Sequence, residues 1–314
     1  MANTDTRTEA LVNSLVGCEF LVTLVESGLS PEYLADPKAS LWLAGSSADS
    51  VERFRADHHL IAAELPALAR EKASEARAVL EHPGTAWWFD DIDLDAQAWV
   101  SIHGTLQKFI YGTPPDTMAW QRPENPSRGW ERYAQKPYGN QTTSTLYGPH
   151  LTSKLVGLHD RVGDYMCEFP LAWWTMRFME KVRVFEVHGP ADWHDLCVRY
   201  PAKGTEDNRL VPNWGAVSEE WDGVHLSLGG LLTAEQNRYE SAAGWTMLDS
   251  WHAEQTYWLR ALKTETERQP DFDEGMGPPM IENLRSHRIG RGGGTLLMSD
   301  EPFWYSRPFR CRDC

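Results

Sequence analysis

The sequence predicts an α+β protein, in which a helical N-terminal third packs on a mixed or antiparallel β core. Apolar residues recur at helical spacing between residues 6 and 82. Beyond them, short β-branched and aromatic runs alternate with loops rich in proline and glycine. No repeat and no linker divides the chain. We therefore expect a helical region over residues 1–84 and an α+β ligand-binding or catalytic region over 85–314, with an irregular tail from Gln269.

The helical region is expected to contain two main helical stretches. Leucine and valine recur through residues 11–25, and Gly28 stands where a helix end is expected. A second helix should begin after Ser47, because hydroxyl residues there can cap it. Pro66 should kink or split this helix, and Pro83 should end its alanine-rich continuation.

Strands dominate the expected structure after residue 85. Alternating or β-branched runs favour a strand, whereas the long apolar run 171–180 favours a buried helix. A second, short helix is expected over 190–199, entered through Pro-Ala-Asp. The expected strands cover residues 99–102, 108–111, 141–146, 181–188, 223–228 and 251–259.

Composition narrows the class of partner. The formal net charge of −15 gives little counterion release on a phosphate backbone, so a nucleic-acid partner is not expected. No apolar run is long enough to cross a bilayer, and residues 1–9 carry no signal-peptide pattern. Five scattered cysteines do not form a secreted disulfide framework. We therefore expect a cytoplasmic protein without a membrane partner. Most of its 15 tryptophans should belong to the core or its edge, and a few should line a small-molecule pocket.

The run 251–259 carries the first candidate site residue, Glu254. Strand alternation would place His252, Glu254, Thr256 and Trp258 on one face. A glutamate within an aromatic strand is unfavourable if it is buried without a partner. Glu254 should therefore either form a salt bridge or face outward, or else stand as a carboxylate at the floor of a cleft.

Two further segments carry polar groups suited to a ligand. Residues 142–145 read Thr-Thr-Ser-Thr, and their hydroxyls can bind a ligand or bond within their own sheet. β-propensity alone also explains the threonines. His103 precedes Gly104, and Tyr111 precedes Gly112; glycine at a strand end lets a ligand approach the backbone. Such short motifs also arise by chance.

In this order, the His-Gly-Thr strand end, the hydroxyl-rich strand and the late glutamate strand resemble the ADP-ribosyltransferase-like fold family. The likeness spans about residues 99–260. It implies that Glu254 takes the catalytic glutamate position and that Ser144 lies in the hydroxyl-bearing strand. Either His103 or Tyr111 would take the first-strand position. The minimal fold of that family has no counterpart of the helical N-terminal third, and no clear nicotinamide loop follows either first-strand candidate.

The resemblance implies NAD as a substrate and attack at the ribose carbon that bears nicotinamide. Because positive charge builds on the ribose as nicotinamide leaves, a carboxylate near the 2′-hydroxyl stabilises the transition state more than the ground state. The catalytic residues would be Glu254 and Ser144. The residues expected to bind NAD are His103, Tyr111, Thr142, Thr143 and Tyr147. The acceptor of ADP-ribose stays open.

Two other functions compete with this one. A degenerate form of the same fold could bind a small molecule or a partner without turnover. A metal-dependent enzyme could use His188 and His194 with Asp192 and Asp195, although their spacing fits no standard metal motif. His225 and Ser227 would share a strand face, and a paired role beside Glu254 is conceivable.

Overall fold

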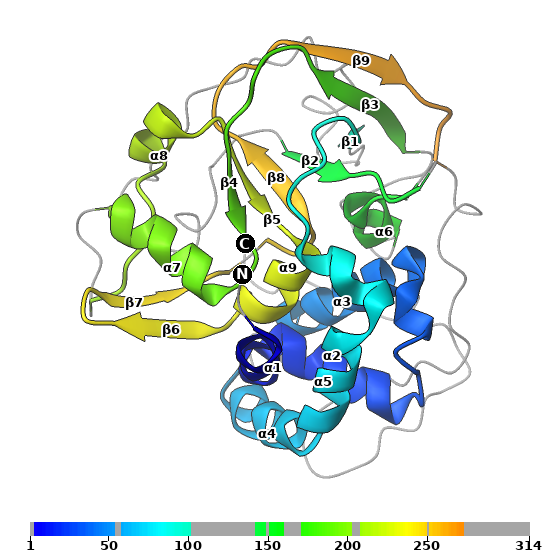
Figure 1. Cartoon of the computed structure of the whole chain (residues 1–314), viewed down its shortest axis with the longest axis vertical. Helices are drawn as coiled ribbons and strands as arrows, with labels where there is room; N and C mark the ends of the chain where they lie inside the picture. The colour runs from blue at the N-terminus through cyan, green and yellow to red at the C-terminus, as the bar shows by residue number, and fades with distance from the viewer. Residues whose placement is uncertain are drawn as a thin grey trace, which may run out of the picture.

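The computed structural model describes residues 3–53, 58–101, 142–148, 151–159, 171–202, 208–249 and 251–272. The fold is α+β, with a group of helices at one end and a mixed seven-stranded sheet at the other (Figure 1). The predicted α+β class is therefore confirmed. The predicted strand 108–111 lies outside the described residues.

Helices fill the N-terminal part of the chain. The helices are α1 (Thr4–Asn13), α2 (Leu15–Glu26), η1 (Tyr33–Ala35), α3 (Pro37–Arg53), α4 (His58–Glu71), α5 (Ala73–Glu81) and η3 (Pro83–Phe89). The apolar helix α2 is buried over most of its length. Beyond it, Gly28 adopts a φ of +66°, as expected for a glycine that ends a helix. Among the described residues no single helix has both the length and the apolarity to cross a bilayer; α1 and α2 reach them together, but across a 94° bend.

The predicted start of the second helix is wrong, and Pro66 does not split its helix. Helix α3 begins at Pro37, eleven residues before the expected start after Ser47, because the Asp36 carboxylate accepts a hydrogen bond from the Lys38 amide at 3.0 Å. Ser47 lies inside this helix and donates its hydroxyl to the Leu43 carbonyl at 2.8 Å. Pro66 lies within α4, and the chain breaks its helix later, at Lys72.

The main sheet has the strand order β4-β5-β8-β2-β1-β3-β9. Only β4 and β5 pair in parallel; the other neighbours are antiparallel. Strand β8 therefore lies between β5 and β2, in the inner part of the sheet. The strands are β1 (Gln97–Ser101), β2 (Thr142–Thr145), β3 (Ala172–Phe178), β4 (Val184–Val187), β5 (Gly223–Leu226), β8 (Gln255–Trp258) and β9 (Thr264–Arg268).

Strand β3 corrects the predicted helix at residues 171–180. Its residues pair with β1 on one side and with β9 on the other, over five positions each. Trp174 packs against Trp99 of β1, with ring centroids 5.0 Å apart. Aromatic side chains suit a pleated surface, and cross-strand pairs of this kind stabilise a sheet. The apolar run is long because both faces of this strand are covered at several positions.

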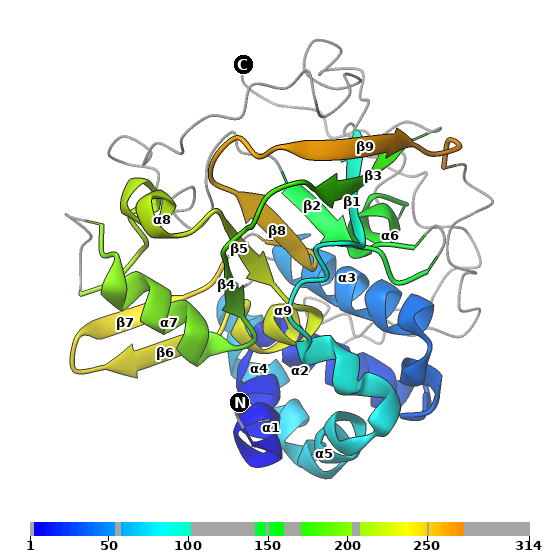
Figure 2. The same cartoon turned by 45° about the horizontal axis from the view of Figure 1, so that its top comes forward.

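The remaining elements surround the main sheet. A separate hairpin joins β6 (Arg238–Ser241) to β7 (Gly244–Met247) and lies beside α7 (Pro190–Arg199) (Figure 2). The short helices are α6 (Ser153–His159), α8 (Trp214–Glu220) and α9 (Leu228–Ala234). Helix α9 lies between the N-terminal helices and the β4–β5 end of the sheet in both views.

Helix α9 connects the two ends of the molecule. The Ser14 hydroxyl, which caps α2, lies 2.8 Å from the Leu232 carbonyl oxygen and 2.9 Å from that of Glu235. One hydrophobic cluster includes Phe20 from α2, Leu231 from α9 and Val224 from β5. The N-terminal helices and the sheet therefore share a core.

We expect Gly17→Ala to lower the free energy of unfolding by about 1–3 kcal/mol, as overpacked sites do. A Cβ atom at Gly17 would lie 2.3 Å from the Leu11 carbonyl oxygen and 2.6 Å from that of Leu232, so α2 would have to move away from α9. Urea unfolding would measure the change. Gly148→Ala is the control, because a Cβ atom there meets nothing within 4 Å. Equal stability of the two variants would contradict the close packing of α2 and α9.

Candidate functional site

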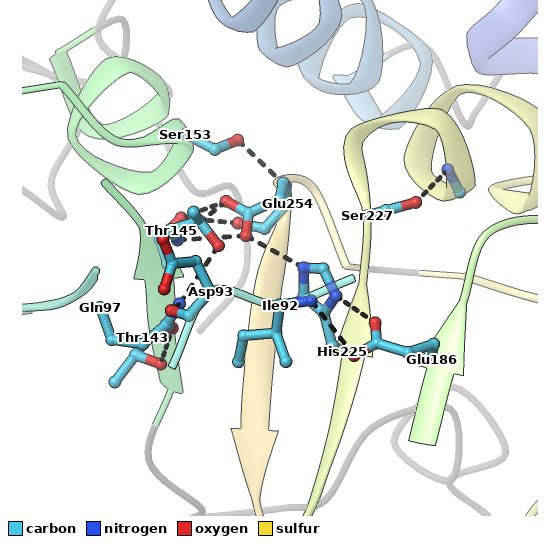
Figure 3. Close-up of polar contacts among 12 residues, drawn as sticks. Ile92, Asp93, Gln97, Thr143, Thr145, Ser153, Glu186, His225, Ser227 and Glu254 are labelled. Atoms are coloured by element: carbon cyan, nitrogen blue, oxygen red, sulfur yellow. Dashed lines mark hydrogen bonds and ion pairs between the residues drawn. The ribbon is translucent and has the colours of Figure 1, made fainter. Parts of the chain in front are cut away.

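Four neighbouring strands each bring one polar side chain to the same place in the sheet. Glu186 comes from β4, His225 from β5 and Ser144 from β2, while Glu254 immediately precedes β8. Because the strand order is β4-β5-β8-β2, these side chains follow one another across the sheet, and Glu186, His225 and Glu254 are labelled in Figure 3. Glu186 and His225 are paired directly in the parallel β4–β5 ladder, so their side chains are neighbours.

Glu254 is the centre of this series, and its side chain is 0 % exposed. Its Oε2 atom accepts a hydrogen bond from the Ser144 hydroxyl at 2.7 Å. Its Oε1 atom accepts from the Thr145 amide at 3.1 Å and lies 3.2 Å from His225 Nε2. The backbone amide of Glu254 donates to Ser153 Oγ at 3.0 Å, which fixes the start of β8. A buried carboxylate is thus provided with donors on both oxygens.

His225 lies between two carboxylates. Its Nδ1 atom is 2.5 Å from Glu186 Oε2, and its Nε2 atom faces Glu254. Burial lowers the pKa of the imidazole, but the hydrogen bonds with Glu186 and Glu254 more than reverse this and raise the pKa to about 9. The ring is therefore an imidazolium near neutral pH, and it donates a hydrogen bond to each carboxylate.

The backbone before β8 differs from the predicted continuous strand. The strand begins at Gln255, and His252 adopts a φ of +64°, so residues 251–254 are not extended. The expected common face for His252, Glu254, Thr256 and Trp258 is therefore wrong as a strand pattern. The break directs Glu254 toward Ser144 and His225 (Figure 3).

The structure brings the two predicted catalytic residues, Ser144 and Glu254, into contact. The threonines predicted to bind NAD make their side-chain hydrogen bonds elsewhere. Thr143 belongs to another network: its hydroxyl donates to Gln97 Oε1 at 2.6 Å and accepts from the Trp258 indole at 3.0 Å. The Thr142 hydroxyl accepts a hydrogen bond from Lys154 Nζ. Neither threonine contacts Glu254 through its side chain. His103 and Tyr111 lie outside the described residues.

Tyr147 lies at the edge of the Glu254 site. Its ring packs on Trp87, with centroids 4.6 Å apart. Burial and the neighbouring charge of Glu254 hold the pKa of the Tyr147 phenol well above its ordinary value. The Tyr147 phenol is therefore neutral and can act as a hydrogen-bond donor beside the carboxylate.

The four residues proposed as a metal set do not form one. His194 makes hydrogen bonds with hydroxyls instead, at 3.0 Å to Thr246 Oγ1 and 2.8 Å to Ser241 Oγ. Asp195 pairs with Arg199, and Asp192 accepts the backbone amide of His188 at 2.9 Å. The suggested pair of His225 and Ser227 beside Glu254 is half right: His225 lies 3.2 Å from Glu254, but Ser227 follows β5 and contacts the His188 ring at 3.1 Å.

Glu186 is the site residue that the sequence reasoning missed. It interrupts the apolar strand Val-Phe-Glu-Val, and this is the same signal that identified Glu254. Its Oε1 atom accepts the Ile92 amide at 3.2 Å, so the loop after η3 is tied to β4.

Chemically, the site holds a carboxylate between a hydroxyl and an imidazole ring. Such a group can stabilise a developing positive charge or position a hydroxyl, and the donors around it fix its orientation. A scan against protein-family models and searches of curated proteins and of solved structures found no match for this chain.

Proposed function

We propose that the protein cleaves the bond between nicotinamide and ribose in NAD and passes ADP-ribose to water or to another acceptor. The observation that carries the proposal is the 2.7 Å hydrogen bond between Ser144 on β2 and Glu254 at the start of β8. The resemblance to the ADP-ribosyltransferase-like fold requires a glutamate next to a hydroxyl-bearing strand, and β2 and β8 are paired neighbours.

In this reaction the bond between the ribose C1′ and the nicotinamide nitrogen breaks, and nicotinamide leaves as a neutral molecule. The electron-poor ribose is then attacked by an oxygen or nitrogen nucleophile, which loses a proton. Glu254 would interact with the ribose 2′-hydroxyl and stabilise the positive charge at C1′. Ser144 and His225 are positioning residues, since each holds one oxygen of the Glu254 carboxylate.

The burial of Glu254 favours a second candidate, a non-catalytic binding module on the same fold. Both oxygens of its carboxylate accept hydrogen bonds from protein groups, and the side chain is fully buried among them. In that case the network would hold four strands in place, and a ligand would bind without being turned over.

Replacing Glu254 by glutamine separates the two candidates. The amide has the same shape but no charge, so nicotinamide release from NAD should fall by about 100-fold or more if the carboxylate stabilises the transition state. Chromatography of released nicotinamide would measure the rate, and circular dichroism would check the fold. Glu265→Gln is the control, because this glutamate is exposed on β9 and should leave the rate unchanged.

Ser144→Ala gives a milder variant in case Glu254→Gln does not fold. It removes one donor to Glu254 and should lower the rate by about tenfold. Saturable NAD binding by the natural chain without nicotinamide release would support the binding module instead. Full activity of Glu254→Gln would exclude Glu254 as the catalytic carboxylate.

A further inference from the structure

Three side chains of the kinds that bind metals converge beside the Glu254 site, and none of them has a role in the proposed reaction. Asp91 follows η3, Glu186 lies in β4 and His188 comes directly after β4. One ligand atom from each residue lies within 4.8 Å of the others. We propose that Asp91, Glu186 and His188 bind a divalent transition-metal ion.

The spacing of the three ligand atoms is close to that of a metal site. Nitrogen and carboxylate ligands lie about 2.0–2.2 Å from ions such as Zn²⁺, so ligand atoms around a tetrahedral ion are about 3.4 Å apart. The three ligand atoms lie within 4.8 Å of one another, and His188 Nε2 and Asp91 Oδ1 are 3.0 Å apart. The Asp91 side chain is 80 % exposed, so it can adjust to an ion without disturbing the core.

The His188 ring is held in an orientation that suits metal binding. Its Nδ1 atom lies 3.1 Å from Ser227 Oγ, and this hydroxyl is itself held by the Gly230 amide at 3.0 Å. When Nδ1 carries the proton and donates to Ser227, Nε2 presents a lone pair to Asp91 Oδ1 at 3.0 Å. Two acceptors at this distance require a proton or a cation between them. Metal-bound histidines are commonly fixed through their other ring nitrogen in this way.

Glu186 retains acceptor capacity for an ion. Its carboxylate offers about four lone-pair directions. Two are used by the Ile92 amide at 3.2 Å and by His225 Nδ1 at 2.5 Å. Glu186 and Asp91 bring two carboxylate groups to the same place, and such a pair favours a cation between them.

The position of the group allows an ion to reach it from solvent. The side chains of His188 and Glu186 are 25 % and 20 % exposed, and Asp91 lies at the surface. Water can therefore complete the coordination shell. Asp90 and Asp93 add negative charge to the same loop, which raises the local concentration of cations.

The ligand set indicates the class of ion. Two carboxylates and one imidazole suit Mn²⁺ or Zn²⁺, whereas Mg²⁺ and Ca²⁺ gain little from the imidazole. Mn²⁺ is the better probe for this chain, because the thiols of Cys311 and Cys314 would compete for Zn²⁺.

The test is a titration of the chelator-treated full chain with Mn²⁺, followed by the electron paramagnetic resonance signal of the free ion. We expect saturable binding of about one Mn²⁺ per chain, and an affinity that falls by about tenfold or more in Asp91→Asn and in His188→Gln. Asp90→Asn is the matched control, since it removes the same charge from the neighbouring exposed position and should retain nearly all of the affinity.

The proposal is overturned if Mn²⁺ does not bind saturably, or if Asp90→Asn weakens binding as much as Asp91→Asn does. Equal losses would mean diffuse attraction to an acidic loop. Unchanged affinity in His188→Gln would equally exclude the mixed-ligand site. Because the readout is ion binding, it is independent of whether the protein consumes NAD.

Discussion

Replacing His225 by leucine should lower the free energy of unfolding by about 3–5 kcal/mol, the range found when one partner of a buried ion pair is removed. The imidazolium lies between Glu186 Oε2 and Glu254 Oε1, at 2.5 and 3.2 Å. Leucine fills a similar volume but leaves Glu254 buried without a cation. Urea unfolding at neutral pH, followed by circular dichroism, would measure the loss.

His194→Leu is the matched control for this prediction. His194 is also buried, but its ring nitrogens face two neutral hydroxyls, those of Thr246 and Ser241. His194→Leu should therefore lower the free energy of unfolding less, by about 1–2 kcal/mol for two neutral hydrogen bonds. If both substitutions lowered the free energy of unfolding equally, packing and not charge would explain how His225 stabilises the fold.

A double variant tests the electrostatic explanation further. His225→Leu combined with Glu254→Gln removes the buried charge together with its partner, so part of the lost stability should return. Additive losses from the two substitutions would mean that the two groups are not coupled in the folded state.

The sequence was sufficient for the fold class and for the first pair of site residues. Threonine-rich β2 and the late strand β8 were both predicted, and their antiparallel pairing brings Ser144 to Glu254. The prediction succeeded because a charged residue in an apolar run needs a partner, whatever the fold. The polar surroundings of Glu254 supply that partner, in the form of a hydroxyl and an imidazolium.

The sequence alone could not identify Glu186 as the partner of His225, because this contact depends on how two strands pair. Glu186 and His225 are opposite each other only because β4 and β5 pair in parallel, with α7 in the connection. Register between strands so distant in the chain depends on tertiary packing. The same signal that identified Glu254 was present at Glu186, but a single glutamate in a short strand is usually a solvated residue.

The prediction of secondary structure failed where a continuous apolar run concealed the alternation that is typical of a strand. Strand β3 reads as a long aromatic run, which suits a buried helix as well as a strand covered on both faces. The start of α3 was marked by Asp36 and Pro37, an N-cap followed by proline at the first helical position. The prediction took the serines at residues 46 and 47 as a helix cap, although they lie inside the helix.

Stability of the N-terminal helices should decrease as the pH rises from about 4.5 to about 7. Glu19 lies buried in the apolar helix α2, and its carboxylate is 3.3 Å from the Ser50 hydroxyl of α3. Burial raises the pKa of the Glu19 carboxyl to about 7; the Ser50 hydrogen bond opposes this shift and the charge of Glu26 adds to it. The folded state therefore prefers the protonated form.

The direction of the effect follows from proton linkage. Below the ordinary pKa of 4.5, Glu19 is protonated in both states and its contribution to stability is fully present. As the pH rises, the unfolded chain loses this proton first, and the contribution is lost by the time the pH passes about 7. One pKa unit corresponds to about 1.4 kcal/mol, so the shift amounts to about 3 kcal/mol.

Glu19→Gln isolates this contribution from the other titrating groups. The amide is neutral at every pH and can still accept the Ser50 hydrogen bond. The stability of the variant minus that of the natural chain should therefore grow by about 3 kcal/mol as the pH rises from about 4.5 to about 8. Urea unfolding at several pH values would follow the difference. Glu26→Gln, at the exposed end of the same helix, should show little of it. A difference between Glu19→Gln and the natural chain that stays constant with pH would mean that water reaches the Glu19 carboxylate, because only a dry environment holds its proton to neutral pH.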